Sequence, residues 1–413
     1  MNPNPPMQDP HPTGMSRRRF LAQAGVGLAA ASTLSRTLAL GSAANSRIRL
    51  GLVGCGDRGQ WILELFAAHG GYEVAAAADY FRDKVDEVAA KFHLPPARTF
   101  TGLECAQKMI AQGGLDAVAL ISPPYFRPAQ ARAAVEAGLH VYAAKPVAVD
   151  APGARSIRTT GEAARRKGLV FLVDFQTRTN PFFIEALRRL HAGSMGDVCF
   201  GEATNHVGRL PIKAPPGTAE ARLRNWVFEK ALSGDIIVEQ NIHVIDVMSW
   251  AMREAPPLRC TGTGGRRVRT DVGDNWDHFA LVYEYADHVG VAFTSQQFGG
   301  HGAPEGYFNR MVGTRGVLST AYGGEVMIFG DADAFYRGGA TSGIYAEGAV
   351  ANVAAFHNAV QAGNAANPTL EPSVTSTLAA ILGRTAAYEG RTIGWSELDR
   401  AGPVVADLSG LQA

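Results

Sequence analysis

The most informative part of the sequence is Ile48-Arg-Leu-Gly-Leu-Val-Gly54-Cys-Gly56-Asp-Arg-Gly59, an apolar strand that leads into a G-x-G-x-x-G turn. In such a turn the first glycine permits the tight bend, the second lets the backbone approach a pyrophosphate, and the third lets a helix pack closely. The pattern predicts a helix from about Gln60, with its first amides directed at phosphates. We therefore expect a dinucleotide to bind Gly54, Cys55, Gly56, Asp57, Arg58 and Gly59.

A second apolar run, Val74-Ala-Ala-Ala-Ala78, ends at Asp79. Asp79 follows Gly59 at the spacing of about 20 residues that is typical of the acid that binds an adenosine ribose. A carboxylate there accepts hydrogen bonds from the ribose diol and repels a 2′-phosphate, which favours NAD. Arg82 and Lys84 lie close by in the sequence and leave NADP open as an alternative.

Composition places the chain among ordinary globular enzymes. Its 413 residues are 46% hydrophobic and carry 39 basic against 38 acidic side chains, so we expect two domains and neither nucleic acid nor an anionic membrane surface as partner. The cysteines are widely spaced without a C-x-x-C pair, which indicates neither a zinc site nor a disulfide framework. They are Cys55, Cys105, Cys199 and Cys260.

The N-terminal segment resembles a twin-arginine export signal. Ser16-Arg17-Arg18-Arg19-Phe20-Leu21 precedes a small-residue apolar run at 22–34, and Gly41-Ser-Ala43 offers a cleavage site. The apolar run is shorter than the ~20 residues that a membrane span needs. We therefore expect residues 1–43 to be a signal peptide, no stable membrane insertion after its removal, and a periplasmic or secreted protein.

Strand and helix patterns alternate over residues 46–174, which predicts a doubly wound parallel sheet that forms an NAD(P)-binding domain. Ligands bind such sheets beyond the carboxyl ends of the strands. The run Leu115–Ile121 ends there at Ser122-Pro123, and the run His140–Ala143 is followed there by Lys145-Pro146. Ser122, Pro123 and Lys145 are accordingly expected beside the cofactor.

The pattern changes after Asp174. Segments rich in β-branched and aromatic residues, such as Phe279–Tyr285 and Val289–Phe298, are joined by Gly/Asp turns and predict an open, mainly antiparallel sheet. We expect residues 175–370 to form a substrate and oligomerisation domain. A C-terminal helix within 371–396 is expected to pack back on the first domain. The predicted fold class is thus α/β with two different sheets.

A third informative stretch runs from Leu232 to Trp250 and is predicted to be a buried helix, since it is apolar nearly all round. Glu239, His243 and Asp246 nonetheless fall on one of its faces. A carboxylate in such surroundings must meet a partner, water or a ligand. The three residues can form a binding site, or Glu239 and His243 can form a structural pair capped by Asp246. A metal site is a third alternative, but the sequence has no HExxH motif or cysteine cluster that would support it.

Other polar residues near strand ends are candidates for substrate contacts. Lys145 can hold a substrate hydroxyl by a charge-assisted hydrogen bond and favour its ionisation, or it can be a solvated lysine in a proline turn. Asp174, Gln176 and Arg178 alternate and so point to one face. Arg178 either meets a substrate oxygen or pairs with Asp174. We expect Gln176, Arg178 and Asp246 to bind substrate.

Three motifs taken in order resemble the Gfo/Idh/MocA oxidoreductases, named for glucose-fructose oxidoreductase and inositol dehydrogenase. They are Gly54–Gly59, then Ala137-Gly-Leu-His-Val-Tyr-Ala-Ala-Lys145-Pro146, then Glu239 through Trp250, and the similarity runs from about residue 47 to residue 396. The resemblance implies a Rossmann domain, a nicotinamide cofactor at the sheet edge, and a sugar or polyol substrate between the domains. It also implies a homo-oligomer formed through the open sheet.

The resemblance also implies roles for individual residues. Lys145 corresponds to the family's Lys-Pro lysine, and Glu239 and His243 correspond to its D-x-x-x-H pair, in which the histidine is the general base and the acid orients it or the substrate. The chain departs from the family at three places. Ala144 replaces the usual glutamate before Lys-Pro, Tyr125-Phe126-Arg127 replaces a frequent histidine, and Glu239 is one methylene longer than aspartate.

Export would constrain the chemistry, because no pool of nicotinamide cofactor exists outside the cytoplasm. We expect an exported NAD(P)-dependent oxidoreductase of a sugar or polyol hydroxyl that holds its cofactor tightly. One alternative is an NAD-dependent glycoside hydrolase or lyase, which oxidises C3 transiently, eliminates the glycosidic bond and returns the hydride to the same molecule. The other alternative is a non-catalytic sugar-binding protein.

Overall fold

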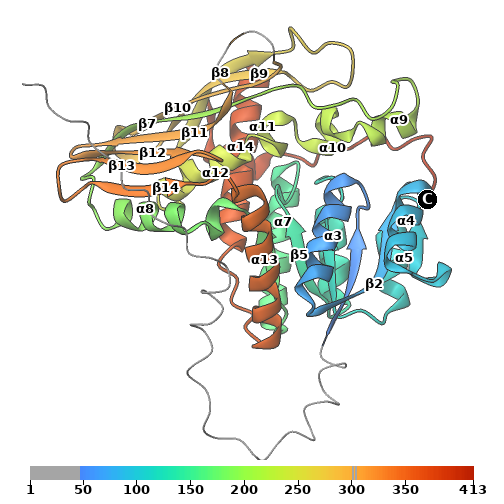
Figure 1. The fold of residues 1–413 in the computed structure, drawn as a ribbon. Coiled ribbons are helices and arrows are strands. Elements are labelled where there is room, and N and C mark those ends of the chain that lie inside the picture. The colour runs from blue at the N-terminus through green and yellow to red at the C-terminus, as the bar shows by residue number, and fades with distance from the viewer. Residues whose placement is uncertain (1–46, 300–301, 303–304) are drawn as a thin grey trace, which may run out of the picture. The chain divides into compact units, whose positions relative to one another are not determined.

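The computed structural model describes residues 47–299, 302 and 305–413, in which two β-sheets are built from different parts of the chain (Figure 1). The predicted signal peptide at 1–43 lies outside the described residues. From Ile48 to Ala413 the chain forms one continuous unit. No helix in the described ranges is long and apolar enough to cross a membrane.

The first sheet has six parallel strands in the order β3-β2-β1-β4-β5-β6, the order of dinucleotide-binding doubly wound folds. Its strands are β1 Ile48–Val53, β2 Tyr72–Asp79, β3 Thr99–Thr101, β4 Ala117–Leu120, β5 His140–Ala144 and β6 Phe171–Asp174. Its helices are α3 Asp57–His69, α4 Arg82–Phe92, α5 Cys105–Gln112, α6 Arg127–Glu136 and α7 Ala151–Arg166. Helices on both faces explain why a central strand such as β4 is buried throughout.

The second sheet has nine strands in the order β14-β13-β12-β11-β7-β10-β9-β8-β15, and every neighbouring pair is antiparallel except β7 with β10. The strands are β7 Val198–Val207, β8 Arg259–Gly265, β9 His278–Glu284, β10 Gly290–Gln297, β11 Gly306–Gly313, β12 Gly316–Ala321, β13 Glu325–Gly330, β14 Tyr336–Ala340 and β15 Ile393–Gly394. The predicted α/β class with a parallel and a mainly antiparallel sheet is therefore confirmed.

Helices cover one face of the second sheet and leave the other open. Along β9 and β10 the buried side chains, such as Tyr283 and Phe293, alternate with exposed ones, such as Val282. The helices of this half are α8 Pro181–His191, α9 Ala219–Arg224, α10 Lys230–Ser233, α11 Ile236–Glu239, α12 Ile242–Ala251, α13 Ile344–Gln361 and α14 Leu370–Glu389. Short 3₁₀ turns are η1 Pro96–Arg98, η2 Thr177–Thr179, η3 Trp226–Phe228, η4 Ala286–His288 and η5 Trp395–Arg400.

Two late helices connect the layers. Helix α14 packs against α7 on one side and against α12 and β8 on the other, and Arg384 donates hydrogen bonds to the backbone of both halves, at Val149 and Gly234. Helix α13 packs on α3, where Tyr72 donates to the carbonyl of Val353. Both helices therefore hold the edge of the first sheet against the second half of the chain.

Two predicted helices differ from the structure. The helix after the glycine turn begins at Asp57 rather than near Gln60, because Gly56 already serves as its N-cap and its carbonyl accepts from the amide of Gln60. The predicted continuous helix from Leu232 to Trp250 is instead the three short helices α10, α11 and α12. The break between α11 and α12 has a specific cause, which lies in the site described next.

Candidate functional site

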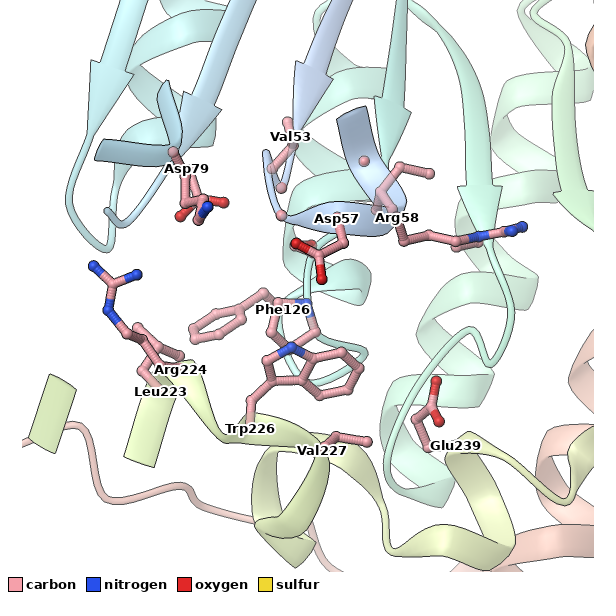
Figure 2. Close-up of a pocket in the computed structure, with 18 of the residues that line it drawn as sticks. Val53, Asp57, Arg58, Asp79, Phe126, Leu223, Arg224, Trp226, Val227 and Glu239 are labelled. Atoms are coloured by element: carbon pink, nitrogen blue, oxygen red, sulfur yellow. The ribbon is translucent and has the colours of Figure 1, made fainter. Parts of the chain in front are cut away.

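A cavity of about 800 Å³ lies at the carboxyl edge of the first sheet and is closed on its other side by residues 210–243. Figure 2 shows Asp57, Arg58 and Asp79 on one wall, and Trp226 and Glu239 on the opposite wall. Most of the residues predicted to bind cofactor or substrate line this cavity: Gly54, Gly56, Asp57, Arg58, Gly59, Asp79, Ser122, Pro123, Lys145, Gln176, Glu239 and His243. Cys55, Arg178 and Asp246 do not line it.

The glycine turn has the geometry of a cradle for phosphates. Gly54 has φ +93°, and a Cβ there would lie 2.6 Å from the amide nitrogen of Ser122. A Cβ on Gly59 would lie 1.8 Å from the carbonyl oxygen of Gly54, so only glycine lets α3 approach this closely. A Cβ on Gly56 would meet nothing within 4 Å. The space above Gly56 is thus left for a ligand, and the residues present fit a dinucleotide.

Asp79 shapes this turn. Its carboxylate accepts hydrogen bonds from the amides of Cys55 at 2.7 Å and Phe81 at 2.9 Å. Burial raises the pKa of Asp79, while the two amide bonds oppose that rise. Asp79 lines the cavity, and its carboxylate has further lone pairs that can accept hydrogen bonds from a ligand. Cys55 belongs to the turn through its backbone, while its side chain is buried.

Lys145 and Glu239 meet across the cavity. The ammonium of Lys145 donates to the backbone carbonyl of Glu239 at 2.6 Å and lies 3.4 Å from its carboxylate. Burial lowers the pKa of Lys145, and the nearby guanidinium groups of Arg58 and Arg127 lower it further, while the Glu239 carboxylate raises it. The Lys145 ammonium therefore lies near two other cations, and the Glu239 carboxylate is the acidic group that offsets them.

This contact explains the broken helix. In a continuous helix the carbonyl of Glu239 would accept from the amide of His243, four residues on. Here that carbonyl accepts from the Lys145 ammonium instead, and the chain resumes as α12 at Ile242. The break lies between Glu239 and His243, and both residues line the cavity, while Asp246 lies further along α12 and does not.

His243 lies among aromatic rings, 5.9 Å from Tyr307, 5.4 Å from Tyr322 and 6.4 Å from Phe175 between ring centroids. Its Nδ1 is buried and has no hydrogen-bond partner within the described part of the chain. Burial lowers the pKa of His243 well below 6.5, and the charges of Lys145 and Arg58 lower it further. The imidazole is therefore neutral near pH 7 and able to accept a proton.

Arg178 and Asp246 form a different cluster outside the cavity. Arg178 binds the Asp246 carboxylate with two nitrogens, at 2.9 and 2.8 Å, and also contacts Glu254 at 2.9 Å. Ser376 of α14 donates to Asp246 at 2.6 Å, and the guanidinium lies 4.9 Å from the centre of the Trp250 ring. The structure thus gives both predicted substrate residues a buried structural pairing. Asp246 does not cap a Glu239–His243 pair.

Asp174 does not pair with Arg178, the alternative that the sequence left open. It binds Arg58 at 2.7 Å and accepts from Asn352 of α13 at 3.0 Å. Arg58 lies 5.0 Å from the ring centres of both Trp61 and Tyr345. This group fixes Arg58 of the glycine turn to α13, near the predicted substrate residue Gln176.

Arg127 is a site residue that the sequence reasoning missed. It is buried, lines the cavity, and donates from one nitrogen to the carbonyls of Ala144, at 3.1 Å, and Pro146. These two carbonyls flank Lys145, so Arg127 holds the backbone that carries the lysine. Burial lowers the pKa of Arg127 to about 9. Its position in Tyr125-Phe126-Arg127, where the chain departs from the family's frequent histidine, was the available sign.

Comparison with known proteins gives the same picture. Residues 48–175 match the model of an oxidoreductase family with an NAD-binding Rossmann fold, and residues 183–319 match a GFO/IDH/MocA C-terminal domain. A glycosyl hydrolase family 109 protein of Solibacter usitatus is 28% identical over 216 residues, 49% of this chain and 47% of that protein. Inositol 2-dehydrogenase 1 of Saccharopolyspora erythraea is 32% identical over 157 residues, 36% of this chain and 43% of that protein.

Each match thus spans less than half the length of the curated relative. Among solved structures, levoglucosan dehydrogenase in complex with NADH and levoglucosan superposes with a TM-score of 0.66 at 17% identity, covering 84% of this chain and 99% of that one. That likeness concerns the fold. Taken with the two family models, which together match most of residues 48–319, it shows that the chain belongs to the Gfo/Idh/MocA oxidoreductase family.

Proposed function

We propose that this protein is an NAD-dependent oxidoreductase that acts on a hydroxyl group of a sugar or polyol. One observation carries the proposal. An ammonium from the first sheet, Lys145, and an imidazole from the second half of the chain, His243, line the same cavity as the open cradle at Gly56. No single one of these features would assign the chemistry, but their convergence matches what hydroxyl oxidation requires.

The residues of the turn would hold the cofactor. The amides at the start of α3 and the space above Gly56 suit a pyrophosphate, and Asp79 suits an adenosine ribose. When bound, a nicotinamide ring supplies the chemistry of accepting a hydride from a carbon that bears a hydroxyl group. Asp79 supports NAD over NADP, since its carboxylate repels a 2′-phosphate.

The protein's own groups would manage the proton. His243 is neutral and is the group suited to take the hydroxyl proton as the carbon is oxidised. Lys145 donates a charge-assisted hydrogen bond to the hydroxyl oxygen and stabilises the negative charge that develops there. Glu239 holds the Lys145 ammonium in place, and Gln176, which is buried with a free side-chain oxygen, is placed to meet a further substrate hydroxyl.

The test is to incubate the purified chain with NAD⁺ and a panel of pyranoses and inositols, and to record the absorbance of reduced nicotinamide. The proposal predicts reduction with at least one member of the panel. A named relative acts on inositol, and a structural neighbour binds levoglucosan with NADH, which sets the classes to include. If ligands bind while no compound is oxidised or cleaved, the protein is a sugar-binding protein and the proposal fails.

A second candidate is redox-neutral cleavage of a glycoside, which the similarity to glycosyl hydrolase family 109 proteins supports. Lys145 and His243 would serve a transient oxidation at C3, which acidifies the C2 proton so that elimination breaks the glycosidic bond. Water would then add to the unsaturated sugar, and return of the hydride to C3 would make the cycle redox-neutral. Release of nitrophenol from nitrophenyl glycosides without net reduction of added NAD⁺ selects this candidate. Net reduction without nitrophenol release selects the first.

We also propose that the chain forms a homo-oligomer through the open face of the second sheet. Phe200, Val282 and Phe308 are exposed there, on β7, β9 and β11. Exposed apolar groups of this kind on one sheet face are typical of a subunit interface. Sedimentation of the unaltered chain and of Phe308→Glu would test this, with dissociation expected for the variant and an unchanged mass contradicting it.

Export through the twin-arginine pathway, with the cofactor already bound, is a further part of the proposal. It rests on Arg17, Arg18 and the following apolar run in the sequence. Fractionation of cells that express the full chain would test it, with the processed protein expected outside the cytoplasm. Replacement of both arginines by lysine is expected to keep the protein inside, and export that persists would contradict the assignment.

A further inference from the structure

Residues 208–228 leave β7 and form the wall of the cavity opposite the glycine turn. In Figure 2, Leu223, Arg224 and Trp226 face the side of the cavity that carries Asp79 and Asp57. This segment, which we name the strap, contains α9 and η3. It lines the cavity with Leu210, Pro211, Lys213, Leu223, Arg224, Asn225, Trp226 and Val227.

The strap is held by a small apolar cluster that is separate from the two large cores. Leu223 of the strap, Leu232 and Ala406 are its buried members. Around them pack aromatic and aliphatic side chains from three places: the loops of the first sheet, the strap with its continuation, and residues 401–413, which we name the tail. They are Tyr80, Phe81, Tyr125, Phe126, Trp226, Ala231, Leu408 and Leu411. So small a cluster can open without disrupting either core.

Two ion pairs join the strap to the first sheet beside the cradle. Lys213 lies 2.7 Å from Asp57, the first residue of α3, and Arg224 lies 2.7 Å from Asp83 of α4. The Arg224 guanidinium also lies 3.8 Å from the centre of the Phe81 ring, and its charge reaches Asp79. Exposed pairs of this kind contribute little to stability by themselves. Lys213 therefore lies at the start of α3, beside the turn that suits phosphates, and Arg224 lies beyond the end of β2, beside Asp79.

The tail fastens the strap from outside. Arg222 donates to the carbonyl of Asp407 at 3.0 Å, which joins strap to tail. The amide of Gln412 donates to the hydroxyl of Tyr80 at 3.1 Å, and its carbonyl accepts from Leu103 at 3.0 Å, which joins tail to first sheet. The tail thus bridges the edge of the first sheet and the strap.

We propose that the strap, fastened by the tail, is a cofactor-retaining element in which Lys213 binds the pyrophosphate of the dinucleotide and Arg224 covers its adenosine end beside Asp79. The inference rests on the proposed function for the identity of the cofactor. A dinucleotide in the cradle would place two negative charges beside Lys213 and its adenosine end beside Arg224, so bound cofactor strengthens the hold of the strap. Release then requires the apolar cluster to open, which makes dissociation slow and keeps the cofactor resident between turnovers.

The experiment measures NADH release from the full chain. Protein loaded with NADH is mixed with excess NAD⁺, and loss of the bound-state fluorescence gives the dissociation rate. We expect Arg224→Ala, and separately a chain ended after Arg400, to release NADH faster by about tenfold, since each loses charged or fastening contacts worth that factor. The matched control is Arg259→Ala, which removes an exposed pair with Glu284 on the second sheet and should release NADH at the original rate.

Lys213→Ala serves as a milder variant should the shortened chain fail to fold, and thermal unfolding without NADH checks that each variant is folded. If folded Arg224→Ala and Lys213→Ala release NADH at the same rate as the unaltered protein, the strap does not retain the cofactor, while the proposed function stands. Failure of the unaltered chain to bind NADH at all overturns the proposed function and this inference together.

Discussion

Residues 239–246 contribute to two charged clusters, one in the cavity around Lys145 and one outside it around Arg178. The two clusters differ in how many of their buried polar atoms have hydrogen-bond partners. In the cavity, Lys145 has one close carbonyl and a carboxylate at 3.4 Å, and His243 has a buried nitrogen without a partner. A few residues on, both carboxylate oxygens of Asp246 accept hydrogen bonds, from two nitrogens of Arg178 and from a serine hydroxyl, although the neighbouring Glu254 leaves one buried oxygen without a partner in the described residues. Buried polar groups in structural roles are normally satisfied. The incomplete cluster is therefore the one poised for a ligand.

The largest expected effect is on catalysis by the incomplete cluster. Lys145→Met removes the ammonium that would stabilise charge on the substrate oxygen, so kcat should fall by on the order of 10³-fold while the unfolding free energy changes little. Steady-state rates on whichever sugar or polyol the protein turns over, with urea unfolding alongside, give both values. A rate within a few-fold of the original would remove Lys145 from the mechanism.

The satisfied cluster should respond in the opposite way. Asp246→Asn leaves Arg178 as a buried charge with a weakened partner, and the unfolding free energy should fall by about 3–5 kcal/mol. Urea unfolding measures the loss. Glu371→Gln, which breaks the exposed pair with Arg158, is the control and should cost under ~1 kcal/mol. Equal stability of the Asp246 and Glu371 variants would contradict the distinction between the clusters.

The pH dependence of the rate sharpens the role of His243. Its folded pKa is lowered below the ordinary 6.5, so the neutral base persists as pH falls through 6.5, and oxidation should decline only at lower pH. By the same linkage, the stability due to neutral His243 is present above pH 6.5 and is lost as pH falls toward the lowered folded pKa. A profile of kcat/KM against pH shows where the rate declines on the acidic side. A midpoint of that decline at or above pH 6.5 would exclude His243 as the base.

The smallest effect concerns Glu239, whose charge raises the pKa of Lys145 against the effect of burial. Glu239→Gln removes that support, so the alkaline limb of the pH profile should move to lower pH, with a modest loss of rate at pH 7. Asp271→Asn, in an exposed pair with Arg209, is the control and should leave the limb in place. A limb that stays in place in Glu239→Gln would show that the acid does not act through the lysine.

Local patterns were enough to predict the first sheet and its turn. Glycine spacing, the apolar run before it and Asp79 at its fixed distance all depend on short-range geometry. The grouping of Lys145, Glu239 and His243 came from the resemblance to the family rather than from local patterns, and the structure brings the three residues to one cavity. The predicted single helix was wrong at two places. Gly234 and Asp235, both with positive φ, end α10 by a local turn. The second break, between α11 and α12, accompanies a long-range contact from Lys145 to the carbonyl of Glu239, which no local periodicity contains.

The same reason explains the other gaps. Arg178 and Asp246 are apart in the sequence, and only their side-chain contact shows that they satisfy each other. The strap has no strong periodicity, and its role depends on packing against Tyr80, Phe126 and the tail. Arg127 is explained by the two carbonyls beside Lys145, which a sequence pattern does not reveal.

The most direct test of the account is NADH binding to Gly56→Ala. A methyl group on Gly56 meets no protein atom within 4 Å, so the variant should fold like the unaltered chain, yet the methyl occupies the space assigned to the pyrophosphate. The account predicts at least about tenfold weaker binding for Gly56→Ala. Gly290→Ala on the second sheet should bind as the unaltered chain does. Unchanged NADH affinity in folded Gly56→Ala would contradict the placement of a dinucleotide on this turn.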